Sequence, residues 1–246
     1  MKISLITVVY NGEKYLRQCM ESVFVQQDVN LEYIVIDGAS TDSTLSIIKS
    51  FGNKINVLVS EPDKGLYDAI NKGIALASGD VIGLLNADDM FANSDVLKKI
   101  SKAFNDNKQL EALYGDLNYI HPVSEKIIRR WKSRKAVFTD FENGWMPAHP
   151  TVYIKKQLFS QYGNYKLNLG SAADYELILR YFFKFRVKME YLPVLMVNMR
   201  VGGVSNSSLI NRIRAIRYDF QAMKINALPN PLIALLKKKL SKLSQY

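Results

Sequence analysis

The chain has 246 residues, of which 48% are hydrophobic and 23% are charged, a composition typical of soluble globular proteins. This length suffices for one large α/β domain or for two small domains. No apolar run is long enough to cross a bilayer, and the N-terminal residues form no signal-peptide pattern. The single cysteine, Cys19, excludes an internal disulfide, fits a reducing cytosol and is expected to be a small buried helix residue.

The formal net charge of +10 is concentrated in two segments. One surrounds Trp131 and contains the cations Lys126, Arg129, Arg130, Lys132, Arg134 and Lys135. The other is the C-terminal tail from residue 210, where Asp219 is the only acidic residue among the cations Arg212, Arg214, Arg217, Lys224, Lys237, Lys238, Lys239 and Lys242. Such clusters predict an anionic partner, either nucleic acid or a membrane surface.

In chain order, β-rich apolar segments alternate with amphipathic helical segments. Strands are predicted at residues 3–9, 33–36, 55–59 and 81–85, and helices are predicted at residues 15–24, 43–48 and 67–77. Near-continuous apolar strands separated by helices are typical of an α/β fold with a mostly parallel central sheet and helices on both faces. The sequence contains no internal repeat and no low-complexity linker that would divide the chain.

Three polar clusters directly follow predicted strands. They begin at Tyr10, at Asp37 and at Asn86. Because ligands of open α/β sheets bind outside the carboxyl ends of the strands, the three clusters are expected to converge on one site. The last cluster contains the adjacent carboxylates Asp88 and Asp89, which repel each other unless a cation lies between them. An isolated Asp-Asp pair is more often a solvated turn, but a divalent cation that carries a diphosphate also explains the pair.

Four segments resemble motifs of the inverting family 2 glycosyltransferases, which have the nucleotide-sugar-binding fold called GT-A. They are TVVYN at 7–11, IDGASTD at 36–42, SEPDKGLYDAINKG at 60–73 and NADD at 86–89. The third is especially similar to bacterial members that build O-antigens, capsules and exopolysaccharides. The resemblance covers residues 3–200. It implies a GT-A catalytic domain at 1–205, with a nucleotide-sugar-binding half at 1–118 and an acceptor half at 119–205, before basic C-terminal helices at 206–246.

The resemblance also implies roles for single residues on the donor side. Asp37 matches the carboxylate that accepts a hydrogen bond from uracil N3–H, which favours a UDP-linked donor, although a turn aspartate is the alternative. The residues expected to contact the nucleotide sugar are Thr7, Val9, Tyr10, Asn11, Asp37, Asp68, Asn71, Asn86, Ala87, Asp88 and Asp89. Tyr10 would stack on the base. Asp68 and Asn71 would border the diphosphate, or they are ordinary polar helix positions.

Asp88 and Asp89 match the metal and ribose carboxylates of the family's Asp-x-Asp motif. Asn86 stands at the first position of that motif and replaces a charged ligand by a neutral oxygen. Oxygen ligands imply Mn²⁺ or Mg²⁺ as the cofactor rather than zinc. The substitution by Asn86 leaves the strength of metal binding open.

On the acceptor side, the segment GSAADYELILR at 170–180 resembles the motif that carries the catalytic base. Asp174 falls on the base position and would remove the proton of the acceptor hydroxyl; a helix N-cap is the competing interpretation. Trp145 and His149 lie in a loop that approaches the active site in relatives. For His149 a structural hydrogen-bonding role is equally consistent with the sequence.

In the C-terminal tail, leucines recur at helical spacing at positions 232, 236, 240 and 243, between lysines. A basic amphipathic helix of this kind lies on an anionic membrane surface, or else it is a terminal helix packed on the core with a solvated lysine face. A membrane position would suit a lipid-linked acceptor. The expected location is therefore cytoplasmic, peripheral at the inner face of the bacterial inner membrane.

The resulting prediction is an inverting transferase that moves a hexose, glucose as the first choice, from a UDP-sugar to a lipid-linked saccharide. The first-choice acceptor is N-acetylhexosamine-diphosphate-undecaprenol, with a β-linked product in O-antigen, lipopolysaccharide or capsule synthesis and no nucleic-acid partner. One alternative is a polyprenyl-phosphate glycosyltransferase, although Ile70 stands where such enzymes often carry arginine. A non-catalytic basic membrane-surface protein is another, but it leaves the polar clusters unexplained. A Rossmann dehydrogenase lacks support because no glycine fingerprint follows the first strand.

Overall fold

The computed structural model describes residues 1–202 and 209–243, with the side chains of 209–212 and 241–243 excepted. The predicted domain boundary between residues 205 and 206 lies outside the described residues. So do the side chains of Arg212, Lys242 and Leu243, which belong to the basic tail.

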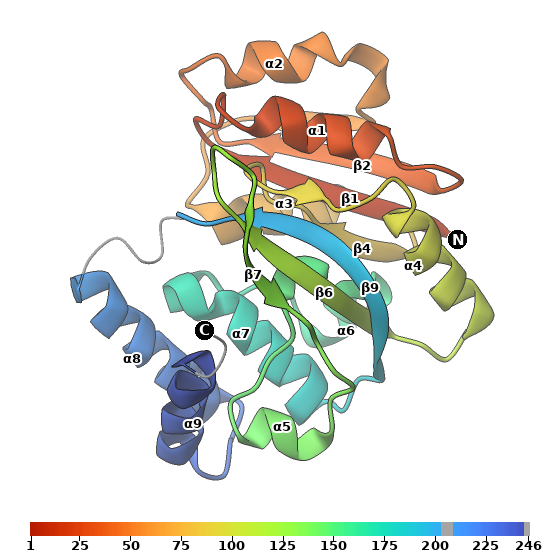
Figure 1. Cartoon of the computed structure of the whole chain (residues 1–246). Helices are drawn as coiled ribbons and strands as arrows, with labels where there is room; N and C mark the ends of the chain where they lie inside the picture. Colours follow the sequence, from red (N-terminus) through yellow and green to blue (C-terminus); the bar gives the residue numbers. More distant parts are fainter. Residues whose placement is uncertain (203–208, 244–246) are drawn as a thin grey trace.

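Within the described residues, one mixed sheet runs through the molecule in the order β3-β2-β1-β4-β8-β6-β9-β5, with β7 paired to β6 (Figure 1). Its strands are β1 (Lys2–Val9), β2 (Asn30–Asp37), β3 (Val57–Ser60), β4 (Val81–Leu84), β5 (Met90–Phe91), β6 (Ala112–Ile120), β7 (Ile127–Trp131), β8 (Tyr153–Lys155) and β9 (Met189–Arg200). The helices are α1 (Leu16–Phe24), α2 (Thr44–Ser50), α3 (Leu66–Leu76), α4 (Val96–Asp106), α5 (Phe138–Glu142), α6 (Gln157–Tyr162), α7 (Ala173–Ile178), α8 (Leu209–Ile225) and α9 (Pro231–Leu243).

The first four predicted strands form the parallel half of the sheet. β1 pairs in parallel with β2 and with β4, and β2 pairs in parallel with β3. Val9 lies opposite Asp37, and Asp37 lies opposite Ser60, so these three strands end at one level. The strand ends that precede the clusters at Tyr10 and Asp37 therefore meet at one edge, and β4, which precedes the cluster at Asn86, runs parallel to β1 toward the same edge with Leu84 opposite Ile6.

The second half of the sheet is mixed. β8 runs antiparallel to both β4 and β6, whereas β6 and β9 are parallel. β8 starts at Tyr153, because residues His149–Thr151 before it form a 3₁₀ turn that contains Pro150. The expected division between residues 118 and 119 falls inside β6, so continuous sheet joins the two predicted halves.

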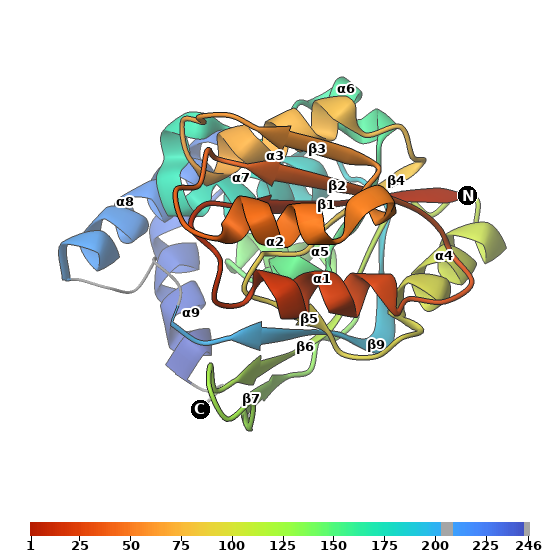
Figure 2. The ribbon, with the colours of Figure 1, turned by 90° about the horizontal axis from the view of Figure 1, so that it is seen from above.

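Helices cover both faces of the sheet, as predicted. Alternation along β1 sends Leu5 and Val9 into one hydrophobic cluster with α1, α2 and α4, and Ile6 and Val8 into another with α3, α6 and α7. Figures 1 and 2 show α1 and α2 on one face of the parallel strands and α3 on the other. Cys19 of α1 is completely buried, as expected.

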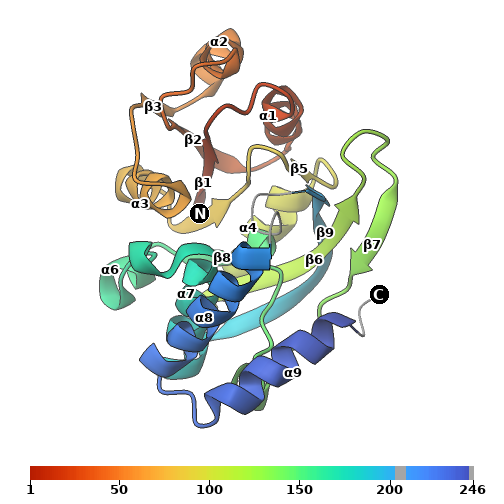
Figure 3. The same ribbon diagram turned by 90° about the vertical axis from the view of Figure 1, so that its left-hand side faces the viewer.

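The C-terminal helices pack beside the second half of the molecule. α8 contacts α7 and the short 3₁₀ segment before it, and α9 contacts α8 (Figure 3). Gly170 permits this packing, since a Cβ atom there would lie 2.6 Å from the Tyr218 ring of α8. Among the described residues, no helix combines the length and apolarity required to span a membrane.

Candidate active site

The loops that follow β1 and β2 are joined by hydrogen bonds between polar side chains and backbone amides. The side chain of Asn11, whose φ is 49°, accepts a hydrogen bond of 2.9 Å from the Thr41 amide. The Asn11 amide donates to Ser40 Oγ at 2.8 Å, and the Gly12 amide donates to Thr44 Oγ1 at 2.8 Å. These contacts explain the YNG and ASTD segments and give the rim of the sheet a fixed shape.

Three predicted donor residues lie in the interior. Asp37 has no exposed surface, and its carboxylate accepts hydrogen bonds from Ser40 Oγ at 2.5 Å and Ser60 Oγ at 2.6 Å. Thr7 is also fully buried and accepts from the Tyr33 hydroxyl at 3.0 Å, while Val9 packs in the core. Asp37 ties β2 to β3, and the other two side chains fill the space below α1; contact of these three residues with the nucleotide base stays a prediction.

Tyr10, which is exposed, and Asp63, which is half-buried, lie next to each other at this rim. The Tyr10 side chain is 65% exposed. A Cβ atom on Gly38 would lie 2.6 Å from Asp63 Oδ2 and 3.5 Å from Tyr10 Cδ2, so the carboxylate and the ring border the same point. The Gly65 amide donates to Asp63 Oδ1 at 2.7 Å and fixes the side chain. An exposed ring beside an acceptor oxygen suits a nucleobase.

The NADD segment forms a tight turn after β4. The Asp89 amide donates to Asn86 O at 3.0 Å, and Asn86 Nδ2 donates to Asp89 Oδ2 at 2.9 Å. Cys19 Sγ donates to the Asn86 carbonyl from below at 3.3 Å. Ala87 is half-buried within the turn. The turn is therefore held by its own polar groups and by α1.

The two carboxylates of this turn differ in their surroundings. Asp89 is 1% exposed and also accepts from the Arg200 amide at 3.1 Å, while burial and the neighbouring Asp88 raise the pKa of Asp89 to about 7. Burial raises the pKa of Asp88 as well, and the Arg200 charge opposes this rise. Asp89 thus supports the turn, whereas Asp88 is half-buried and is the more accessible carboxylate.

This donor set fits a hard divalent cation whose other ligands come from a substrate diphosphate. Two desolvated carboxylates with raised pKa values gain from a nearby positive charge. The set consists of oxygen atoms from Asp88, Asp89 and Asn86, which suits Mn²⁺ or Mg²⁺. Within residues 1–202 and 209–243, no cluster of three His, Cys, Asp or Glu side chains offers a complete protein site.

Asp68 and Asn71 both support the loop after β3 and its neighbours. The Lys64 amide donates to Asp68 Oδ2 at 3.0 Å, which closes the turn that contains Asp63. Asn71 donates to Tyr165 O at 2.9 Å and accepts from Tyr165 N at 3.0 Å. Both polar ends of the Asn71 amide thus contact the backbone of a distant loop, and the contact of Asp68 and Asn71 with a diphosphate stays a prediction.

Asp174 and His149, predicted from separate segments, lie side by side. His149 Nδ1 is 3.1 Å from Asp174 Oδ2, and the two side chains are 43% and 16% exposed. Tyr67 also lies close to the Asp174 carboxylate, and burial together with the negative charge of Asp174 raises the pKa of Tyr67 well above its usual range. The N-cap of α7 is Ala172, so the capping interpretation of Asp174 is wrong. The carboxylate lies in the first turn of the helix and contacts the start of α3.

Trp145, the other predicted acceptor-side residue, forms part of the wall beneath this loop. Its ring is half-buried and meets Phe141 and Tyr114 edge-on, with centroids 5.7 and 5.9 Å away. The Arg134 guanidinium lies 5.2 Å from the ring centroid. Trp145 is therefore packed on three sides and holds the segment that leads to His149.

Comparisons with known proteins decide the family. A model described as "Glycosyl transferase family 2" matches residues 4–163. The chain belongs to glycosyl transferase family 2. It is 26% identical over 211 residues to the PGL/p-HBAD biosynthesis glycosyltransferase of Mycobacterium bovis, a match that covers 83% of this chain and 79% of the relative. Its fold is the GT-A-type α/β fold expected from the motifs.

Two solved structures extend the likeness in fold. Staphylococcus aureus TarS, crystallised with UDP, gives a TM-score of 0.72 at 19% identity and covers 99% of this chain and 72% of that one. The Pyrobaculum calidifontis mannosyltransferase PcManGT, in complex with GDP-Man and Mn²⁺, gives 0.64 at 18% identity and covers 96% and 68%. None of these three names refers to an O-antigen or a capsule, so that part of the resemblance stays a prediction.

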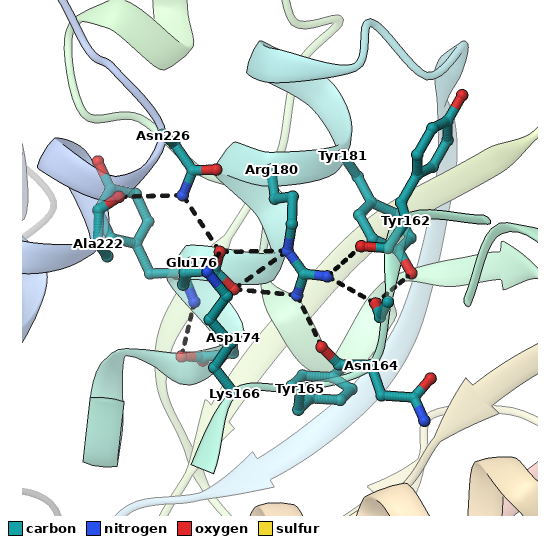
Figure 4. A network of polar contacts seen from close by, with 12 residues as sticks. Tyr162, Asn164, Tyr165, Lys166, Asp174, Glu176, Arg180, Tyr181, Ala222 and Asn226 are labelled. Atoms are coloured by element: carbon teal, nitrogen blue, oxygen red, sulfur yellow. Dashed lines mark hydrogen bonds and ion pairs between the residues drawn. The ribbon is translucent and has the colours of Figure 1, made fainter. Parts of the chain in front are cut away.

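In this family 2 glycosyltransferase, a buried ionic network positions α7 (Figure 4). Glu176 has no exposed surface and pairs with Arg180 at 3.0 Å and Lys166 at 3.2 Å. Asn226, the residue directly after α8, also donates to Glu176, at 3.3 Å. Arg180 in turn donates to three consecutive backbone carbonyls, those of Tyr162, Gly163 and Asn164. The network thus ties the helix that carries Asp174 to the loop before Tyr165.

Sequence reasoning missed several residues of the transferase. Asp63 had a usable signal, because it follows the third strand as a fourth polar cluster at the same rim. Tyr67 was assigned only to the apolar face of its helix. Arg200 had no local signal: it donates to Asp88 O at 2.5 Å across 112 residues and supports the NADD turn from the end of β9.

Proposed function

We propose that the transferase moves a hexose from a UDP-sugar to a lipid-linked saccharide with inversion at the anomeric carbon. The observation that carries this proposal is the Asp174 carboxylate, which lies 3.1 Å from His149 Nδ1 and close to Tyr67 of α3. Tyr67 follows the loop that contains Asp63, so the carboxylate lies next to the donor-side elements. A partly exposed carboxylate held in this way suits a general base.

In the proposed reaction the acceptor oxygen forms a bond to the anomeric carbon while the bond from that carbon to the diphosphate oxygen breaks. The proton of the acceptor hydroxyl passes to the Asp174 carboxylate. His149, with its proton on Nδ1, holds that carboxylate toward the acceptor. Asp88, Asp89 and Asn86 would hold a divalent metal, which would stabilise the negative charge on the departing diphosphate. Because the usual UDP-hexoses are α-linked, the product is β-linked.

The donor assignment is supported by the rim around Tyr10. Uracil has a ring N3–H that a carboxylate can accept, and Asp63 offers an oxygen beside the exposed Tyr10 ring. We assign base recognition to Asp63, because Asp37 is buried and engaged by two serines. TarS, similar in fold, was crystallised with UDP. UDP-glucose is the first-choice donor, followed by UDP-galactose and UDP-N-acetylglucosamine.

For the acceptor we propose N-acetylhexosamine-diphosphate-undecaprenol, in O-antigen, lipopolysaccharide or capsule synthesis at the cytoplasmic face of the inner membrane. The support is the basic C-terminal region, where Asp219 is the only acidic residue from position 210 onward. The M. bovis relative is named for PGL/p-HBAD biosynthesis. A polyprenyl phosphate is the competing acceptor for the same site.

Calorimetric titration of the protein with UDP and with GDP, each with and without Mn²⁺, tests the donor. Mn²⁺-dependent binding of UDP alone supports the proposal and leads to a screen of UDP-sugars against synthetic lipid acceptors. Preferential binding of GDP would assign the donor to the class bound by PcManGT. Absence of binding to either nucleotide contradicts the proposed activity.

A further inference from the structure

Helix α9 presents a row of large aliphatic side chains to solvent. Leu232, Ile233, Leu236 and Leu240 are 66%, 51%, 63% and 62% exposed. Their spacing places them along one side of a helix of 13 residues. Single exposed apolar residues are common, but a continuous row on one helix marks an interaction surface.

The rotation of α9 about its own axis is set by the opposite side of the helix. Ala234 is 1% exposed and Lys238 is 7% exposed. Lys238 Nζ lies 2.8 Å from Asp219 Oδ1 and 3.2 Å from the centroid of the Tyr175 ring. A Cβ atom on Gly144 would lie 2.6 Å from Ala234 O, so α9 touches the backbone directly. The expectation of a solvated lysine face is therefore wrong for Lys238, which is buried while the leucines are exposed.

Exposed cations lie on the same helix as the aliphatic row and on the neighbouring helix. Lys237 and Lys239 are exposed on α9 itself, and Arg217 and Lys224 are exposed on α8. α9 contains no acidic residue, and Asp219 of α8 is already paired with Lys238. The surface therefore combines apolar side chains with unneutralised positive charge.

Strand β7, on the same side of the molecule, also carries exposed aliphatic and cationic side chains. Figures 2 and 3 both place β7 on the side of the molecule where α9 ends. Ile127 and Ile128 of β7 are 45% and 52% exposed, and Val123 in the preceding turn is 76% exposed. Lys126 and Arg130 are exposed beside them. Two elements that are distant in sequence thus offer aliphatic and cationic side chains to one side.

We propose that α9 and β7 form a docking surface for an anionic lipid bilayer, with the aliphatic row in the headgroup region and the cations on lipid phosphates. This inference rests on the lipid-linked acceptor of the proposed function and names the surface that brings the site to it. Charge complementarity selects the occupant. A second copy of this chain would oppose lysines to lysines, whereas an anionic bilayer neutralises them and accepts leucines.

Sedimentation with vesicles tests the surface on the full chain. The wild type is expected to bind vesicles of phosphatidylglycerol and phosphatidylethanolamine and to bind phosphatidylcholine vesicles at least roughly tenfold more weakly. Leu236→Glu with Leu240→Glu is expected to lower binding to the anionic vesicles by at least roughly tenfold. Leu76→Glu is the matched control, because Leu76 is 46% exposed at the end of α3, away from α9, and it should bind like the wild type.

Two parallel measurements separate the outcomes. The double variant should transfer sugar to a short soluble acceptor at the wild-type rate, and light scattering should find the same mass for both proteins. A wild type that transfers sugar but ignores anionic vesicles would overturn the docking surface and leave the proposed function intact. A wild-type dimer that the double variant dissociates would overturn it in favour of a second copy. Vesicle binding without transfer would remove the proposed function and leave a membrane-surface protein.

Discussion

His149 Nδ1 lies 3.1 Å from Asp174 Oδ2. The histidine comes from a 3₁₀ turn between two prolines, and the aspartate comes from the first turn of α7. The histidine is the more exposed partner, with 43% of its side chain accessible against 16% for the aspartate. A carboxylate that lies against a neighbouring imidazole and close to Tyr67 has a restricted orientation, which favours proton transfer from a bound hydroxyl.

Asp174→Asn should lower kcat by roughly 10²–10⁴-fold, the usual contribution of a general base. The amide keeps the shape and the contacts of the side chain but cannot accept the proton. The affinity for UDP, measured by calorimetry with Mn²⁺, should stay within about twofold of the wild type, because Asp174 touches no donor residue except Tyr67. Wild-type turnover in this variant would remove Asp174 from the mechanism.

Comparing His149→Asn with His149→Ala tests whether His149 orients the Asp174 carboxylate or only fills space beside it. Asparagine retains a donor that can reach the carboxylate, whereas alanine does not. We expect kcat to fall by roughly tenfold in the alanine variant and to recover most of that loss in the asparagine variant. Thermal unfolding should be nearly unchanged, since the ring is largely exposed. Equal loss in the two variants would indicate that the histidine has another role, such as a direct contact with the acceptor.

Local patterns in the sequence predicted the parallel half of the sheet and the place of the site. Strands β1, β2 and β4 are mostly apolar and buried, and a polar cluster lies at or just after the end of each. The same patterns did not give the contacts of single side chains. Local spacing did not indicate that Asp37 bonds to Ser60, which lies 23 residues away, or that Asn71 bonds to Tyr165, which lies 94 residues away. Such pairings depend on the register between strands and on packing between distant loops, which spacing along one segment does not encode.

Without a bound metal, the stability of the folded protein should depend on pH through the carboxyl group of Asp89 in the NADD turn. Burial and the adjacent Asp88 raise the pKa of Asp89 to about 7, so the folded metal-free protein holds a proton there that the unfolded chain, with an ordinary carboxyl pKa, releases near pH 4. The contribution of this group to stability therefore falls as pH rises between those values, and a bound cation offsets the loss. Mn²⁺ with UDP should raise the unfolding temperature more at pH 8 than at pH 6.

Asp88→Asn is the control for this metal effect. It removes the neighbouring charge and one candidate ligand, so both the Mn²⁺ response and its pH dependence should disappear in thermal unfolding scans. Nucleotide binding should also lose its dependence on Mn²⁺. A wild-type response to Mn²⁺ in Asp88→Asn would exclude Asp88 as the metal ligand.

Asp63→Asn should weaken the preference for uracil over cytosine. The carboxylate accepts from uracil N3–H and repels the bare N3 of cytosine, whereas an amide can turn to serve either base. The ratio of UDP to CDP affinity should fall by roughly tenfold, which corresponds to about 1.4 kcal/mol. Glu61→Gln is the matched control on the same loop, because Glu61 is 53% exposed and pairs with Lys72. An unchanged ratio in Asp63→Asn would return base recognition to another group.

Arg180→Met should destabilise the fold by about 3–5 kcal/mol, because it leaves the buried Glu176 charge without its main partner. Arg180 is 7% exposed and donates to Glu176 and to three carbonyls, so no solvent replaces its contacts. The unfolding temperature should fall by roughly 10 °C for a chain of this size. Lys102→Met is the control, since Lys102 and Asp106 form an ion pair at 2.6 Å with side chains that are 73% and 61% exposed, and it should cost about 0.5 kcal/mol or less. Similar shifts in the two variants would show that the Glu176 network does not hold α7 in place.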